Sequence, residues 1–225
     1  MEQLVSWILN RLLTLPVILI ALSVHELCHG YSAYLLGDST AKSMGRLSLN
    51  PLKHVDPLGF LSLLFFQIGW AKPVVVNSRY FKNPKAGMVI TSLSGPISNF
   101  VLAFFSSFIY VLIEKLGATF GFMSSSRNGI LVGAYLSVLI MSKFMITINL
   151  GLGIFNLIPI PPLDGSKVLY GFLPYEIILK ILPYENYIRI FLMIALFLGF
   201  LTAPISISVQ WIENLFLGIA RGVLF

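Results

Sequence analysis

The sequence Ser-Val-His-Glu-Leu-Cys-His-Gly occupies residues 23–30 and contains the pattern H-E-x-x-H inside an otherwise apolar segment. An α-helix turns once in about 3.6 residues, so His25 and His29 lie one above the other on the same helix face. Two imidazoles at this spacing can bind one Zn²⁺, and Glu26 lies beside them, where a general base for a zinc-bound water belongs. The stretch therefore predicts a metal-binding helix.

This helix is long enough to cross a membrane. At about 1.5 Å per residue, a helix from Arg11 to Gly37 extends roughly 40 Å, which exceeds the about 30 Å of a hydrocarbon core. The H-E-x-x-H pattern lies near its middle. Ionisable side chains at that depth are rare and costly, and they often form structural pairs or ion paths. Two hypotheses follow: a metalloprotease site within the bilayer, which accounts for the spacing of the three ionisable residues, and a proton or ion relay.

The composition indicates a multispan membrane protein. Hydrophobic residues make up 57% of the 225 residues and charged residues only 11%, with a mean hydropathy of +0.89; a soluble protein carries about 25% charged residues. No basic segment or small-residue cleavage site precedes the histidines, so the first helix is expected to be retained. The net charge of +6 is not clustered, which favours contacts with lipid headgroups over nucleic-acid binding. We expect a single membrane core over residues 1–225.

The predicted fold is an all-α polytopic membrane protein with about four to six transmembrane or half-spanning helices. The expected helices are residues 1–37, 87–113, 130–155, 187–201 and a shorter last one over 209–225. In the polar connection 38–86, the alternating stretch 45–51 and the β-branched stretch 72–77 are typical of short strands, and together they predict a small membrane-associated β-hairpin or sheet. The apolar stretch 58–70 between them is too short to span and fits a re-entrant segment.

Positive charge predicts the orientation. The connection 38–86 carries seven Lys and Arg residues, whereas the loop 114–129 carries two. Cytoplasmic loops are enriched in Lys and Arg, so the first connection should be cytoplasmic, and so should the proline-rich turn over 156–186. The site would then open to the cytoplasmic side.

A catalytic zinc usually has three protein ligands, so a third must join His25 and His29. Asp164 is the best candidate because prolines precede it and leave an irregular turn, which at membrane depth must be buried or line a cavity. Asp164 could instead be the N-cap of a helix that starts at Ser166. Both roles remain open from local chemistry alone.

Four other polar residues have weaker assignments. The single cysteine, Cys28, points to a different helix face from His29 and fits a small buried hydrophobe better than a ligand. Lys143, about midway along the third span, is expected to pair with a carboxylate such as Glu26 or Asp164, or to extend towards the membrane surface. His54 and Asp56 lie in a turn-rich loop and are interpreted as turn residues.

The motifs in combination resemble the site-2 protease family of intramembrane zinc metalloproteases, in its compact prokaryotic form. They are His25-Glu26-x-x-His29, Ser94-Gly95-Pro96-x-x-Asn99, Asn156-x-x-Pro159-x-Pro161-x-Leu163-Asp164-Gly165, and the stretches 45–51 and 70–74. The resemblance implies one Zn²⁺ per chain bound by His25, His29 and Asp164, with Glu26 as the base and Asn156 assisting at the substrate carbonyl. From the residue alone, Asn156 could instead cap the third helix. Many members add a PDZ or CBS domain, which this chain does not show.

The predicted function is therefore hydrolysis of peptide bonds in single-span membrane proteins, in a prokaryotic cell membrane. A substrate helix must unwind, and an unwound strand in lipid needs backbone partners, so Val74, Val75 and Val76 are candidate substrate-binding residues, as is Asn99. The alternatives are a metal-ion or proton transporter and an inactive adaptor that binds helices. An intact Glu26 argues against the adaptor, and polar residues gathered at one depth argue against a transporter. The oligomeric state is left open.

Overall fold

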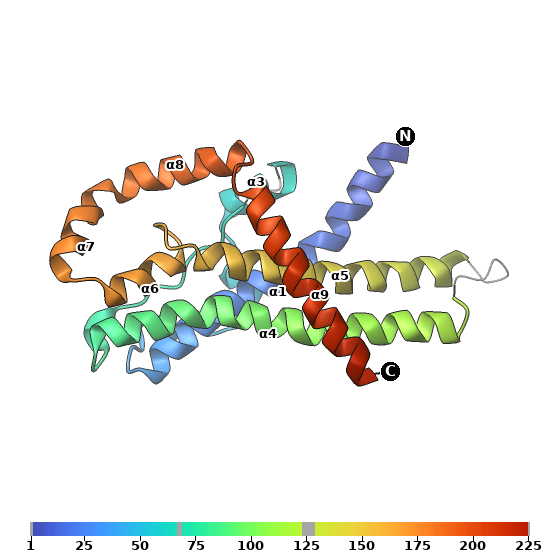
Figure 1. Cartoon of the computed structure of the whole chain (residues 1–225), viewed down its shortest axis with the longest axis horizontal. Helices are drawn as coiled ribbons and strands as arrows, with labels where there is room; N and C mark the ends of the chain where they lie inside the picture. The colour runs from blue at the N-terminus through green and yellow to red at the C-terminus, as the bar shows by residue number, and fades with distance from the viewer. Residues whose placement is uncertain (1, 67–68, 123–128, 225) are drawn as a thin grey trace.

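The computed structural model describes residues 2–66, 69–122 and 129–224, and these ranges are largely helical (Figure 1). The helices are α1 (Glu2–Leu35), α2 (Thr40–Ser43), α3 (Pro57–Phe66), α4 (Pro84–Thr119), α5 (Gly129–Leu157), α6 (Asp164–Phe172), α7 (Tyr175–Ile181), α8 (Glu185–Phe197) and α9 (Thr202–Leu224). Short 3-10 turns lie at Pro51–Lys53, Ser78–Tyr80 and Leu182–Tyr184. The predicted all-α membrane fold is confirmed.

Among the residues that the structure describes, three helices are long and apolar enough to cross a membrane. The spans are Arg11–Leu35 of α1, Pro84–Thr119 and Gly129–Leu157. A fourth is possible if the pair Tyr175–Phe197 and Thr202–Leu224, bent by 74°, counts as one broken span. In Figure 1, α4 and α5 lie side by side, α9 crosses them, and α6, α7 and α8 form an arch at one end. The last helix begins earlier than predicted, because Pro204 lies in its first turn, where a missing N–H costs little.

Local signals explain where the site-bearing helices begin and end. Helix α1 ends at Leu35, and Gly37 follows with φ of 107°, a left-handed conformation that favours glycine. Helix α4 begins at Pro84, and the side chain of Asn83 accepts a hydrogen bond from the Ala86 N–H at 3.1 Å. Gly37, Asn83 and Pro84 therefore explain where the two helices that flank the connection 38–86 end and begin.

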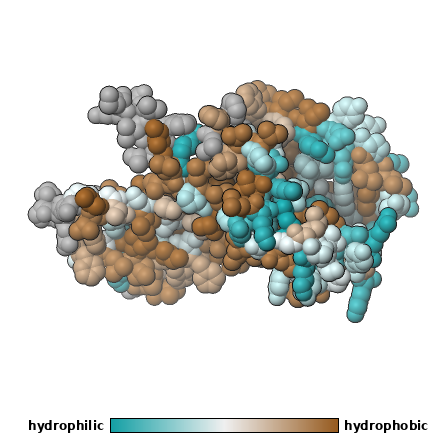
Figure 2. Space-filling model, turned by 180° about the vertical axis from the view of Figure 1, so that it is seen from behind, coloured by the Kyte–Doolittle hydropathy of each residue, from teal (hydrophilic) through white to brown (hydrophobic). Residues whose placement is uncertain are grey.

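The main core lies between α4, α5 and α9. Its buried members are small or aliphatic: Ala103, Val111, Ile146, Leu150, Val209, Leu217 and Ala220. Small residues allow transmembrane helices to approach closely. Hydrophilic residues gather at one end of the molecule, on the right in Figure 2, whereas hydrophobic residues cover most of the rest of that face. The same end carries α7 and the beginning of α4 in Figure 1, whereas α3 lies nearer the middle of the molecule.

The predicted β-hairpin or sheet is wrong. Within the described ranges, stretches 45–51 and 72–77 form no strand, and the only pairing of that kind is an isolated antiparallel bridge between Val55 and Ala71. The guanidinium of Arg46, rather than a partner strand, donates to the carbonyls of Lys72 and Pro73. A side chain thereby occupies the hydrogen-bonding groups that strand pairing would have used.

Lys143 pairs with neither Glu26 nor Asp164. Its ammonium forms an ion pair with Glu213 of α9, and Thr147 Oγ1 lies 3.1 Å from the other oxygen of that carboxylate. Lys143 thus lies on the face of α5 that packs against α9, and the sequence did not indicate Glu213 as its partner.

Candidate metal centre

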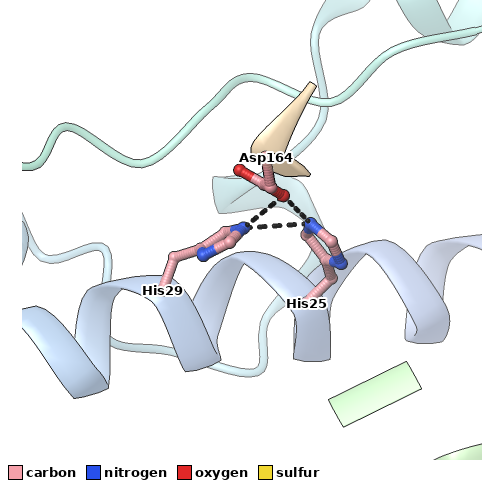
Figure 3. A group of neighbouring side chains, drawn as sticks. All are labelled: His25, His29 and Asp164. Carbon is pink, nitrogen blue, oxygen red and sulfur yellow. Dashed lines mark hydrogen bonds and ion pairs between the residues drawn. The ribbon is translucent and has the colours of Figure 1, made fainter. Parts of the chain in front are cut away.

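Two histidines of α1 and one carboxylate from the start of α6 converge at a single point (Figure 3). Asp164 Oδ2 lies 3.2 Å from His25 Nε2 and 3.1 Å from His29 Nε2, and the two Nε2 atoms are 3.0 Å apart. All three residues are buried, with exposed fractions of 5%, 8% and 6%. The i, i+4 spacing predicted for the histidines is therefore realised, and Asp164 joins them from 135 residues further along the chain.

The protonation of the two imidazoles follows from their outer hydrogen bonds. His29 Nδ1 lies 2.7 Å from the Thr91 carbonyl oxygen, which can only accept, so Nδ1 carries the proton. Asn99 Nδ2 donates to the Ala21 carbonyl and to Asn149 Oδ1, so Asn99 Oδ1 is the atom that accepts from His25 Nδ1 at 2.6 Å. In neutral imidazoles both Nε2 atoms then present lone pairs to each other and to Asp164.

This arrangement fits a zinc ion. Three acceptor atoms facing one another without a proton between them repel, and a shared cation removes that repulsion. Zinc–nitrogen and zinc–oxygen bonds of about 2.0–2.2 Å place tetrahedral ligand atoms roughly 3.3 Å apart, close to the observed separations. Two histidines and one carboxylate are also a known ligand set of catalytic zinc.

A relay of two amides positions His25. Asn99 of α4 donates from Nδ2 to Asn149 Oδ1 of α5 at 2.8 Å, and Asn149 donates to the Met145 carbonyl at 2.8 Å. Both amides are fully buried. Hydrogen bonds to the outer nitrogen of a ligating histidine fix its tautomer and orientation. Asn99, predicted to contact substrate, is therefore found against the outer side of His25.

The proline-rich turn brings Asp164 to α1. Helix α5 ends at Leu157, and Asp164 begins α6 after Leu163, whose backbone is extended. A Cβ on Gly165 would overlap the Leu157 carbonyl group, so only glycine permits this close approach. The second carboxylate oxygen of Asp164 lies 3.3 Å from Lys167 Nζ. Asp164 is thus the first residue of its helix, one residue after the N-cap.

Glu26 lies one residue after His25 and is held by the connection. Its Oε2 accepts a hydrogen bond from the Val74 N–H at 2.8 Å, and its exposed fraction is 9%. This fixes one oxygen of the carboxylate and links the helix that carries the histidines to the stretch 72–77.

The stretch 72–77 is anchored at its far end by a buried carboxylate that the sequence did not single out. Asp38 is fully buried and accepts hydrogen bonds from the Asn77 N–H at 2.6 Å and the Thr40 N–H at 2.9 Å. Burial by itself raises the pKa of Asp38, but the hydrogen bonds from Thr40 and Asn77 outweigh it and leave the pKa below its usual value. The signal available in the sequence was only a polar residue directly after a helix-ending glycine.

Other predicted residues lie outside the cluster. Asn156, in the last turn of α5, donates from its side chain to the Leu152 carbonyl at 3.0 Å. His54 Nε2 lies 2.7 Å from the Ser48 carbonyl, and Asp56 accepts from the Gly59 N–H at 2.8 Å at the start of α3. The contacts of His54 and Asp56 agree with their interpretation as turn residues. Cys28 is not part of the group of converging ligand atoms.

Comparisons with known proteins give a consistent match. The model of Peptidase family M50 matches residues 13–202. YwhC of Bacillus subtilis, named as a candidate zinc metalloprotease, is 37% identical over 194 residues, which are 86% of this chain and 82% of YwhC. Two proteins called Rip2, with the same kind of name, are 26% identical in Mycobacterium tuberculosis (88% of this chain, 71% of the relative) and 29% identical in Mycolicibacterium smegmatis (67% and 53%). No solved structure gives a significant match.

Proposed function

Because the chain belongs to peptidase family M50, the site-2 proteases, it is an intramembrane zinc metalloendopeptidase, and we propose that His25, His29 and Asp164 hold its zinc. The observation that carries this assignment is the meeting of three unprotonated ligand atoms within 4.8 Å of one another. When bound, zinc lowers the pKa of a water molecule and polarises the carbonyl of the bond to be cleaved.

Glu26 is proposed as the general base and acid. Because Val74 holds Oε2, the other oxygen, Oε1, is left to take a proton from the attacking water and to deliver it to the leaving nitrogen. Asn156 is proposed to stabilise the developing oxyanion. Its back-bond to Leu152 uses one N–H of the amide, which leaves the second to donate to substrate.

Metal removal tests this proposal directly. We expect a zinc chelator to abolish cleavage of a model single-span substrate by the purified protein, and one equivalent of zinc per chain to restore it, because the site has one set of ligands. A Cys28→Ser variant is the control and should bind the same amount of zinc. Cleavage that persists in protein shown to be metal-free would contradict the proposal. The match to family M50 does not favour the alternatives of a transporter or an inactive adaptor.

The substrate backbone is proposed to pair with the non-helical stretch around Val74, Val75 and Val76. Val75 is 49% exposed, and none of the hydrogen bonds between described residues uses the N–H of Val75 or Val76. The Val74 N–H donates to Glu26, which places this stretch of backbone next to the proposed base. Addition of an extended peptide to a free backbone edge is a common recognition mode.

Removal of one N–H from this edge should weaken substrate binding. We expect Val75→Pro to lower turnover by up to about tenfold, the equivalent of one backbone hydrogen bond, with unchanged zinc content. Turnover of Val75→Pro is compared with that of Val75→Ala, which loses the side chain but keeps the N–H. Equal turnover in the two variants would show that the substrate does not use this donor.

We propose that the site opens to the cytoplasmic side of a prokaryotic cell membrane, with single-span membrane proteins as substrates. Seven Lys and Arg residues lie in 38–86 and two in 114–129, and cytoplasmic loops carry the excess. Lys42, Lys53 and Lys72 of this connection are exposed, which supports its contact with water. The bacterial organisms of the relatives support the prokaryotic assignment.

A further inference from the structure

A cavity of about 930 Å³ lies between α1, α3, α5, α8 and α9. This is at the upper end of the about 300–1,000 Å³ range of ligand sites, and its walls are mainly aliphatic and aromatic. It adjoins the metal centre, because Ser23, two residues before His25, and Leu163, directly before Asp164, both line it. The cavity therefore lies next to the two segments that carry the converging ligand atoms.

A polar spot interrupts these apolar walls. Lys143, Thr147 and Glu213 all line the cavity, and the ammonium and carboxylate form an ion pair. The Lys143 side chain is 41% exposed, whereas that of Glu213 is 9% exposed. Ionisable groups at membrane depth are costly to bury and usually have a function. The mechanism proposed above does not use this pair.

The spot lies at a defined height relative to the metal centre. Asn149 is linked through Asn99 to His25, and Lys143 precedes Asn149 by six residues on α5, or about 9 Å along the helix axis. A substrate side chain at that height is about six residues from the cleaved bond if the substrate is helical there, or about three if it is extended.

We propose that this cavity binds the membrane-embedded flank of the substrate and that Lys143 and Glu213 favour an uncharged amide side chain in that flank. The inference rests on the proposed function, which requires a membrane-spanning segment to reach the metal centre within the bilayer. Apolar walls match the apolar side chains of such a segment. An amide complements both members of the pair, since its N–H can donate to Glu213 and its carbonyl can accept from Lys143. An acidic side chain would compete for Lys143 and leave Glu213 without its counter-charge.

The test is a positional scan of a model single-span substrate in phosphatidylcholine vesicles, cleaved by the full chain with zinc bound. The reference substrate carries Met throughout its apolar segment, and each variant replaces one Met by Gln, which is nearly the same size. We expect Gln to lower KM by about threefold to twentyfold, the range for hydrogen bonds between membrane helices, at one position three to six residues from the cleaved bond. The value of kcat should change little.

Variants of the protein show whether the ion pair causes the preference. In the double variant Lys143→Met with Glu213→Gln, the ratio of KM values for the Met and Gln substrates should approach one. The matched control removes the ion pair between Glu114 and Arg221, which joins α4 to α9 outside the cavity, and should retain the ratio. The inference is overturned if no position shows a Gln preference, as expected if lipid chains fill the cavity, or if the preference survives in the double variant. Failure to cleave even the Met reference would instead refute the proposed function.

Discussion

Glu26→Gln should lower the rate of cleavage by a factor of about 10² to 10⁴, the usual contribution of general acid–base catalysis, while the protein retains its zinc. The amide has the size of the carboxylate, and its oxygen can still accept the hydrogen bond from Val74, so the stretch 72–77 should stay in place. The amide, unlike the carboxylate, cannot take a proton from water at neutral pH. Glu26 is also not one of the three residues whose ligand atoms converge, so metal binding should persist. The measurement is the rate on a model single-span substrate together with zinc per chain.

The same substitution at another carboxylate provides the control. Glu114 lies on α4 and is paired with Arg221, so Glu114→Gln makes the same chemical change away from the metal centre. A Glu26→Gln protein that cleaves at more than a tenth of the wild-type rate would remove Glu26 from the mechanism. Transport of metal into sealed vesicles that survives Glu26→Gln would favour the transporter hypothesis.

The parts of the site that could be predicted are those with a local periodic signal. The i, i+4 spacing placed His25 and His29 on one face, and the length of the apolar segment placed that face inside a membrane. Asp164 lacked such a signal. Its prolines indicated only an irregular turn, and the expectation that it is a ligand came from the family resemblance.

The contacts between helices could not be predicted, because they depend on which faces meet. Asn99 and Asn149 are single polar residues in two apolar helices, and nothing near either of them shows that they hydrogen-bond to one another. Lys143 and Glu213 are separated by 70 residues, and their pairing depends on how α9 crosses α5. The strand predicted from the alternation at 45–51 is absent for a different reason. The Arg46 side chain donates to the carbonyls of Lys72 and Pro73, which a partner strand would have used.

The largest structural effect is expected from Gly95→Ala, a change that adds one methyl group to α4. A Cβ at this position would overlap the His29 ring and lie 2.8 Å from His25 Cε1, closer than real Cβ contacts allow. The rings cannot simply turn away, because the Thr91 carbonyl and the Asn99 side chain hold their outer nitrogens. We expect a 10- to 100-fold loss of zinc affinity, the usual cost of disturbing the surroundings of a metal ligand, and a further loss of about 10² in turnover at saturating zinc.

Gly133→Ala on α5 separates this effect from the general consequences of replacing glycine in a helix. Nothing lies within 4 Å of a Cβ at Gly133, so that variant gains helix propensity without a new contact. Competition with a chelator gives the zinc affinity of both proteins. Equal affinities would mean that α4 can move away from α1 without loss, and hence that the position of the histidines does not depend on the close packing of these two helices. A selective loss in Gly95→Ala would show that the absence of a side chain on α4 leaves the room in which the two imidazoles meet Asp164.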